Sequence, residues 1–140
     1  MGYLFISYPS LLREVLELTI DARDYVQSCD LQRLTTASRL RHAAESMRLT
    51  AVLSDAMNWL RGGAELAAGS IDREQQIRHF SARAGATLRA MRQDLPGELT
   101  DLADLLSRTR ALYERIERLD RQIACLLPSH EQESVPAALR

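Results

Sequence analysis

The amino-acid sequence predicts an all-α protein, namely an antiparallel three-helix bundle with a partly helical connector before the last helix. Three observations lead to this prediction. Apolar residues recur every three or four positions over long stretches, which is the pattern of a helix buried on one side. Only six glycines and four prolines interrupt the 140 residues. β-branched residues are sparse, which favours helix over strand.

The length of the chain fits one domain whose core needs neither a disulfide nor a metal ion. We expect residues 1–127 to form this single bundle domain. Residues 128–140 begin at Pro128 and are mostly small or polar, so they cannot bury enough apolar surface to fold. We therefore expect a disordered C-terminal tail.

The first helix is predicted from about Pro9 to Gln27, because proline suits a first turn and Ser7 can cap it. Its apolar stripe consists of Leu11, Leu12, Val15, Leu16, Leu18, Thr19, Ala22, Tyr25 and Val26. The other side of this helix carries what we call the acidic stripe, Glu14, Glu17, Asp21 and Asp24.

The second helix is predicted to begin near Leu34 and to reach at least Leu60. Two rows of apolar residues overlap on it: Leu40, Ala44, Met47 and Ala51 in the first row, and Leu49, Val52, Leu53, Ala56 and Leu60 in the second. An apolar arc this wide is too large for one neighbour, so we expect this helix to be central. Its end is open: Gly62-Gly63 breaks the helix, or the helix continues to a cap at Gly69.

From Ile71 to Asp94 the helical pattern weakens, and we interpret this segment as a mobile connector with some helix. Asp72 and Gln75 resemble a capping box that opens a helix. After the turn at Pro96-Gly97, a third long helix is predicted from Glu98 to Leu127. Its apolar residues are Leu99, Leu102, Leu106, Thr109, Tyr113, Ile116, Leu119, Ile123 and Leu126. Favourable i,i+4 charge pairs are expected at Asp104–Arg108, Glu114–Arg118 and Glu117–Arg121.

Composition disfavours several classes of function. The net charge is −1, and all 18 basic residues are arginines spread along the chain rather than gathered in a basic patch, so we expect no nucleic-acid partner. No apolar run approaches the roughly 20 residues that a membrane span needs. Cys29 and Cys125 are isolated, which is typical of reduced thiols. We therefore expect a cytoplasmic protein that does not enter a membrane.

Residues with catalytic potential are not grouped in the sequence. His42, His79 and His130 have no second ligand at metal-binding spacing, so we expect surface histidines, no metal and no cofactor. Asp101 and Asp104 are expected on a solvated helix face, which does not favour a catalytic carboxylate pair. We therefore expect no catalytic residues, and Trp59 is interpreted as a core or subunit-contact residue.

One stretch resembles a known family. Ala22-Arg23-Asp24-Tyr25 is followed by Glu45-Ser46-Met47-Arg48-Leu49-Thr50, then by Asn58-Trp59-Leu60 and Ala68-Gly69-Ser70-Ile71. In order and spacing this resembles the RcdA family, the regulators of CtrA degradation in alphaproteobacteria, over about half the chain. The motif residues of the resemblance are Glu45, Arg48, Leu49, Thr50, Trp59 and Leu60.

The resemblance implies a three-helix bundle, a homodimer and an adaptor role in cell-cycle proteolysis by ClpXP. Such adaptors deliver a protein substrate to ClpX together with the response-regulator-like CpdR. Two alternatives remain. Arg115 to Ile123 is similar to the opening helix of helical chorismate mutases, which would imply a small helical enzyme. The second alternative is a dimeric helical module with an unknown regulatory role.

Two interfaces are expected from the residues themselves. The central helix has more apolar surface than its two neighbours need, so we predict a homodimer in which Met47, Ala51 or Trp59 takes part. Partner proteins are expected to use the acidic stripe and the face of the third helix that carries Arg108, Arg115 and Arg118, in a salt-sensitive manner.

Overall fold

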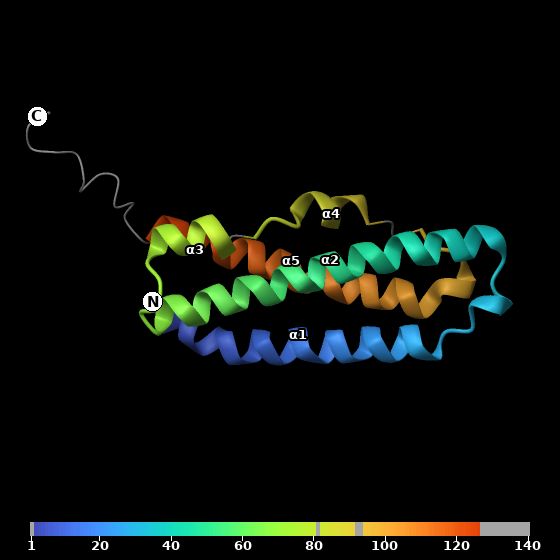
Figure 1. The fold of residues 1–140 in the computed structure, drawn as a ribbon, viewed down its shortest axis with the longest axis horizontal. Coiled ribbons are helices and arrows are strands. Elements are labelled where there is room, and N and C mark those ends of the chain that lie inside the picture. The colour runs from blue at the N-terminus through green and yellow to red at the C-terminus, as the bar shows by residue number, and fades with distance from the viewer. Residues whose placement is uncertain (1, 81, 92–93, 127–140) are drawn as a thin grey trace, which may run out of the picture.

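The computed structural model describes residues 2–80, 82–91 and 94–126, and these residues form helices joined by short loops (Figure 1). The long helices are α1 (Gly2–Ser28), α2 (Thr36–Ala67) and α5 (Thr100–Leu126). Between α2 and α5 lie the short helices α3 (Arg73–Phe80) and α4 (Gly85–Ala90), and two 3-10 turns occur at Leu31–Arg33 and Gly97–Leu99. No strand occurs among the described residues, so the predicted all-α fold is confirmed.

The three long helices pack pairwise into a bundle, and α2 contacts each of the other four α-helices. The directions differ in part from the prediction. Glu14 pairs with Arg115 and Asp21 with Arg108, so α1 and α5 are antiparallel. Tyr8 near the start of α1 bonds Leu60 near the end of α2, so α1 is antiparallel to α2 as well.

α2 and α5, however, run in parallel, because position 55 meets position 113 and position 59 meets position 120. The predicted antiparallel arrangement therefore holds for α1 against both neighbours but not between α2 and α5. The physical reason is the connector. Through α3 and α4 it carries the chain back along the bundle before α5 begins (Figure 1).

The predicted start of α1 at Pro9 is wrong, since the helix begins at Gly2 and Pro9 lies inside it. One hydrogen bond ties the segment before Pro9 to the bundle: the Tyr8 hydroxyl donates to the carbonyl of Leu60 at 2.6 Å. Proline removes one backbone donor from the helix, and the Tyr8 contact attaches the turn before Pro9 to α2.

The buried face of α1 is also displaced from the predicted stripe. Leu11, Val15 and Leu18 are buried, with Ala22 and Tyr25 partly buried beside them. Leu16, Thr19 and Val26 are exposed instead. Their periodicity was ambiguous, because α1 has apolar residues on two adjacent sides and only one of them faces the core.

α2 is capped at both ends, and its second predicted ending is the one observed. The Thr35 hydroxyl accepts from the backbone N–H of Ser38. The helix passes through Gly62-Gly63 and ends at Ala67, and Gly69 follows with a φ of 75°. The Gly69 and Ser70 N–H groups donate to the carbonyls of Leu66 and Glu65, which is the Schellman pattern that ends many helices.

The predicted capping box at the start of α3 is confirmed: Gln75 N–H donates to Asp72 and Asp72 N–H donates to the Gln75 side chain. The core is made by buried residues of all three long helices, including Leu49, Leu53, Leu60, Leu102 and Tyr113. The predicted end of the last helix at Leu127 and the predicted tail from Pro128 lie outside the described residues.

Candidate protein-interaction surface

The side of α2 that faces away from the core has an unusual composition. We call the exposed residues between positions 40 and 58, all of which the structure describes, the outward face of α2: Leu40, Ala43, Ala44, Met47, Thr50, Ala51 and Ser54. None of them is charged, although 26% of the whole chain is. Leu40 is 69% exposed and Met47 is 74% exposed. A helix face that only has to stay hydrated usually carries charges, so the composition of this face makes it a candidate contact surface.

The charged residues of the same stretch are turned inward or sideways. Arg41 donates to the backbone carbonyl of Asp94, and Glu45, which is only 1% exposed, pairs with Arg48. Asp55 accepts the hydroxyl proton of Tyr113 in a hydrogen bond. Each of these charges thus has a partner within the chain. Between positions 40 and 58, α2 therefore has an outward side without charges, unlike an ordinary surface helix.

The exposed apolar residues of α2 follow a regular spacing. Leu40, Ala44, Met47 and Ala51 are separated by four, three and four residues, which is the heptad pattern of a helix that packs against another helix. This is the first apolar row predicted from the sequence. The second row, from Leu49 to Leu60, is buried in the core, so the second row packs within the chain while the first row is exposed.

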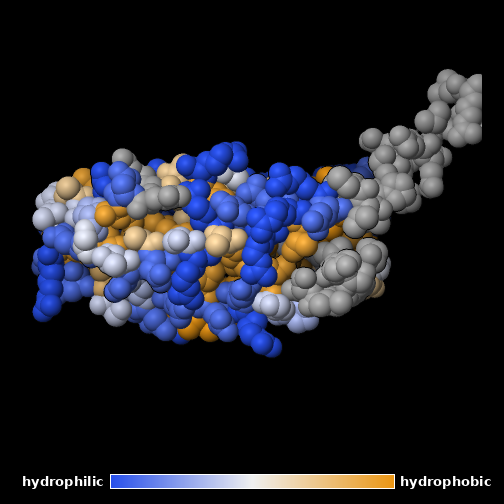
Figure 2. Space-filling view, turned by 180° about the vertical axis from the view of Figure 1, so that it is seen from behind, coloured by the Kyte–Doolittle hydropathy of each residue, from blue (hydrophilic) through white to orange (hydrophobic). Residues whose placement is uncertain are grey.

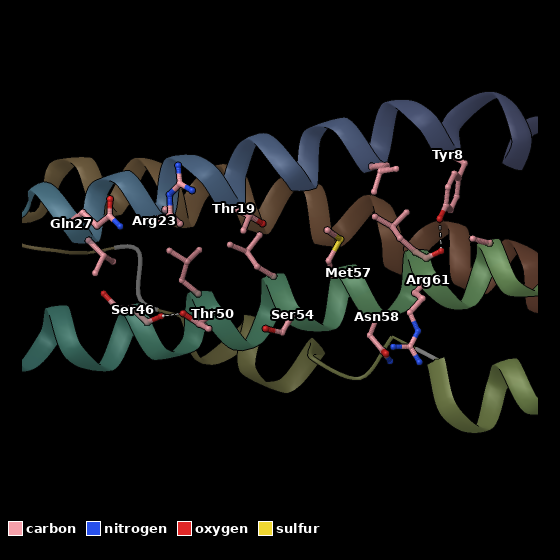
Figure 3. A pocket seen from close by; sticks show the side chains of 17 residues that line it. Tyr8, Thr19, Arg23, Gln27, Ser46, Thr50, Ser54, Met57, Asn58 and Arg61 are labelled. Carbon is pink, nitrogen blue, oxygen red and sulfur yellow. Dashed lines mark hydrogen bonds between the residues drawn. The ribbon is translucent and has the colours of Figure 1, made fainter.

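A groove of about 990 Å³ runs between α1 and α2 beside this face (Figure 3). Its apolar lining includes Leu12, Leu49, Leu53 and Met57. Thr50 and Ser54 belong both to the rim of this groove and to the outward face of α2. The groove and the face are therefore one continuous surface.

The hydroxyl groups beside the groove are turned toward the backbone. Thr19 donates to the carbonyl of Val15 at 2.7 Å, and Thr50 donates to that of Ser46 at 2.9 Å. These threonines therefore present mainly their methyl groups to a partner. Among the described residues that line the groove, the charged ones are Arg23 and Arg61, and no carboxylate is present.

The motif residues of the family resemblance lie mainly inside the bundle. Leu49 and Leu60 are core residues. Trp59 is 2% exposed, and its indole Nε1 donates to Asp120 Oδ1 at 2.9 Å. Trp59 thus joins α2 to α5, which is the first of its two predicted roles, that of a core residue. Thr50 is exposed on the candidate surface.

The acidic stripe of α1 and the arginine face of α5 lie opposite each other. Arg115 bonds Glu14 at 2.6 Å and Arg108 bonds Asp21 at 2.9 Å. Arg108 also lies 3.9 Å from Asp104, as expected for that i,i+4 pair. Four of the predicted partner-surface residues thus hold α1 against α5.

Three predicted partner-surface residues lie outside these cross-helix pairs. Glu17, Asp24 and Arg118 are exposed; Asp24 is bonded to its neighbour Arg23. Seen from behind, the molecule is hydrophilic over most of its surface, with apolar residues visible in a hollow along its length (Figure 2).

His42 was predicted to lie on the surface, and this prediction is wrong. It is 7% exposed, and its ring lies 5.5 Å from that of Tyr25. Its Nε2 has no hydrogen-bond partner among the described residues, and burial lowers the pKa of its imidazole. Burial also raises the pKa of the neighbouring Tyr25 hydroxyl, helped by its contact with the Cys29 thiol. The side chains of His79, Cys125 and His130 lie outside the described residues.

Within the described part of the chain, no three His, Cys, Asp or Glu side chains form a group suited to a metal ion. No described helix is long and apolar enough to cross a membrane. The candidate site is made by the outward face of α2 and the groove beside it.

A family model described as protein of unknown function (DUF1465) matches residues 8–139. The chain belongs to the DUF1465 family. The match includes the candidate surface and every described element except the first turns of α1. No curated protein and no solved structure matches the chain, so membership in DUF1465 defines the family without assigning a role to it.

Proposed function

We propose that this DUF1465 protein is a non-enzymatic adaptor that binds other proteins in the cytoplasm and works as a homodimer. The observation that carries the proposal is the uncharged outward face of α2, with Leu40 and Met47 largely exposed. Contiguous apolar surface of this kind on a folded chain marks an interaction site.

A second copy of the chain fits this surface best. Leu40 and Met47 protrude next to a groove on the same side of the molecule, so two copies related by a two-fold axis can each insert these residues into the other's groove. Such self-complementarity is what an isologous dimer contact requires. The heptad spacing of the first row further favours two α2 helices packed at a shallow angle.

The size of the surface also suits a dimer. Residues 40–58 of a helix extend over about 27 Å, and two adjacent helices present a width of roughly 20 Å. The product of this length and width is a flat area on the order of 500 Å². The solvent-accessible area is larger, because side chains protrude from this plane. This is comparable to the roughly 800 Å² per partner in stable protein interfaces.

The resemblance to the RcdA family supports a more specific role in regulated ClpXP proteolysis. The expected partners are ClpX, a CpdR-like response regulator and a protein substrate. The exposed charges Glu17, Asp24 and Arg118 stay available for them after α1 and α5 have paired. Contacts through such residues are steered by electrostatics and weaken with added salt.

The chorismate-mutase alternative is less well supported by the same residues. In the segment from Arg115 to Ile123, Arg115 pairs with Glu14 and Asp120 accepts the indole proton of Trp59. Ile116 and Ile123 are core residues. The groove between α1 and α2 has no carboxylate among its described lining residues, whereas such an enzyme needs converging arginine and acidic side chains.

Capture of partners from native cytosol tests the adaptor role. We expect the immobilised protein to retain ClpX, a CpdR-like protein or a proteolytic substrate at low salt. The double variant Glu17→Arg/Asp24→Arg should retain at least about tenfold less, because it reverses two exposed acidic charges. Exposed Gln122→Arg on α5 is a matched control that should retain as much as the wild type. Equal retention by all three proteins, or none by the wild type, contradicts the proposal.

A further inference from the structure

α4 lies on α2 and α5 in the manner of a short bound helix. It contacts both of them and lies at the edge of the bundle away from α1 (Figure 1). The side chains of Ala84, Leu88 and Met91, which lie in α4 or directly beside its ends, are buried. These residues stand at positions i, i+4 and i+7, the spacing by which amphipathic helices anchor in partner proteins.

The start of α4 is held by two side chains of the long helices. Asp55 Oδ2 accepts from the backbone N–H groups of Arg83 at 3.0 Å and Ala84 at 3.3 Å. The Tyr113 hydroxyl accepts from the same Ala84 N–H at 2.8 Å and donates its proton to Asp55. Burial, together with this bond to Asp55, raises the pKa of the Tyr113 hydroxyl. The hydroxyl therefore stays protonated and can donate this hydrogen bond.

The end of α4 is held by one guanidinium. Arg110 Nη2 donates to the carbonyl of Leu88 at 2.8 Å and to that of Met91 at 3.0 Å. A carboxylate at the start of a helix and a cation at its end both complement the helix dipole. The surface of α2 and α5 beneath α4, which we call the α2/α5 seam, therefore recognises both ends of a helix as well as its apolar side.

α4 has little to stabilise it apart from these contacts. It has six residues, begins at Gly85 and is preceded by the non-helical residues Ala82 and Arg83. A helix of this length does not persist alone in water. Segments held by few buried side chains open at far lower free energy than the core of a domain. Leaving the seam and unfolding are thus one event for α4.

We propose that the α2/α5 seam is a helix-binding site that α4 occupies in the resting chain and that a helix of a partner protein takes over. The inference rests on the proposed protein-binding function and adds a second, concealed surface to it. α4 acts as an internal ligand that competes with the partner, so its opening sets how readily the partner binds.

The contacts made by α4 indicate which kind of partner helix the α2/α5 seam accepts. The helix carries a small residue followed by large aliphatic residues four and seven positions later, as Ala84, Leu88 and Met91 do. It begins and ends within about two turns, because Asp55 needs free N–H groups and Arg110 needs free carbonyls. A long continuous helix would deprive Asp55 of its two backbone donors and Arg110 of its two carbonyl acceptors, which is costly at a partly buried site.

Hydrogen exchange of the intact protein tests whether α4 opens on its own. We expect amides of residues 85–91 to exchange at least about tenfold faster than those at the centre of α5. Tyr113→Phe should speed exchange in α4 by about a further tenfold, because a hydrogen bond to a charged acceptor is lost. Tyr8→Phe removes a hydroxyl bond elsewhere and should leave α4 unchanged. If α4 exchanges only together with the whole domain in the wild type, the inference is wrong.

Peptide binding tests the seam itself. A labelled synthetic peptide of residues 82–95 should bind the variant Leu88→Ser/Met91→Ser, whose own α4 lacks its anchors, at least about tenfold more tightly than the wild type. Adding Arg110→Met should remove that binding. A folded double variant that does not bind the peptide overturns the proposal, and if this variant fails to fold, the exchange measurement alone decides. Neither experiment depends on partner capture or on the dimer, so each proposal can fail without the other.

Discussion

At the scale of single residues, α2 buries two polar side chains and leaves two large apolar side chains exposed. Glu45 and His42 are buried near the core while Leu40 and Met47 are exposed to water. Burial of Glu45 is compensated by its pairing with Arg48. Burial of His42 is compensated only in part, because its Nε2 has no partner in the part of the chain that the structure describes. This residue therefore makes the stability of the bundle depend on pH.

His42→Leu should reduce that dependence. Burial lowers the pKa of His42 from its usual 6.5 in the folded state, so below about pH 6.5 the unfolded chain takes up the proton first. The free energy of unfolding of the wild type should thus fall as the pH drops through 6.5 toward the lowered pKa, and stay level in this respect above it. The variant should show a smaller fall between pH 7.5 and 5.5 in urea unfolding, with equal or greater stability at pH 7.5. An unchanged pH profile would contradict this account of His42.

The sequence could predict some of these residue environments and not others. The i,i+3 spacing of Glu45 and Arg48 indicated a pair on one helix, and the pair is present. Its depth was not predictable, because burial of a charge depends on which neighbours cover it. His42 carried no local signal either, since a histidine between alanines and arginines reads as a surface residue. The bond from Trp59 to Asp120 joins residues 61 positions apart, and no local pattern reveals such a contact.

At the scale of elements, local capping chemistry indicated two helix ends, the Asp72–Gln75 box that opens α3 and Gly69 as one of the two predicted endings of α2. The Asp72–Gln75 capping box and the Gly69 cap depend on local chemistry that the sequence displays. The start of α1 was missed because the bond from Tyr8 to Leu60 spans 52 positions. The parallel course of α2 and α5 was missed for a similar reason: the connector had too weak a pattern to show which way it runs.

Gly69→Ala tests the cap at the end of α2. The φ of Gly69 is 75°, where a Cβ atom is strained, so the variant should lose about 1 kcal/mol of unfolding free energy. Gly97→Ala is the matched control: an added Cβ meets no atom within 4 Å there and no positive φ is involved, so its effect should stay within about 0.5 kcal/mol. The measurement is urea unfolding of both variants. Equal losses would show that backbone conformation at Gly69 does not account for the effect.

At the scale of the whole molecule, two surfaces have opposite character: one is bordered by ion pairs and the other is uncharged. The contact between α1 and α5 is bordered by the ion pairs Glu14–Arg115 and Asp21–Arg108. Exposed pairs of this kind each contribute about 0–1 kcal/mol, so they guide how α1 docks more than they stabilise it. The outward face of α2 has no such charges and faces away from the core. A central helix with an uncharged outer side is explained if a second protomer covers that side.

Sedimentation equilibrium of the purified chain at micromolar concentration tests this claim most directly. The wild type should be a dimer. Met47→Glu should be a monomer of unchanged helix content by circular dichroism, because it places a charge in the centre of the proposed contact. Ile77→Glu on α3, at a residue that is also largely exposed but lies off this face, should remain a dimer. A wild type that is monomeric throughout, or a folded Met47→Glu variant that still dimerises, would contradict the claim that the outward face of α2 joins two protomers.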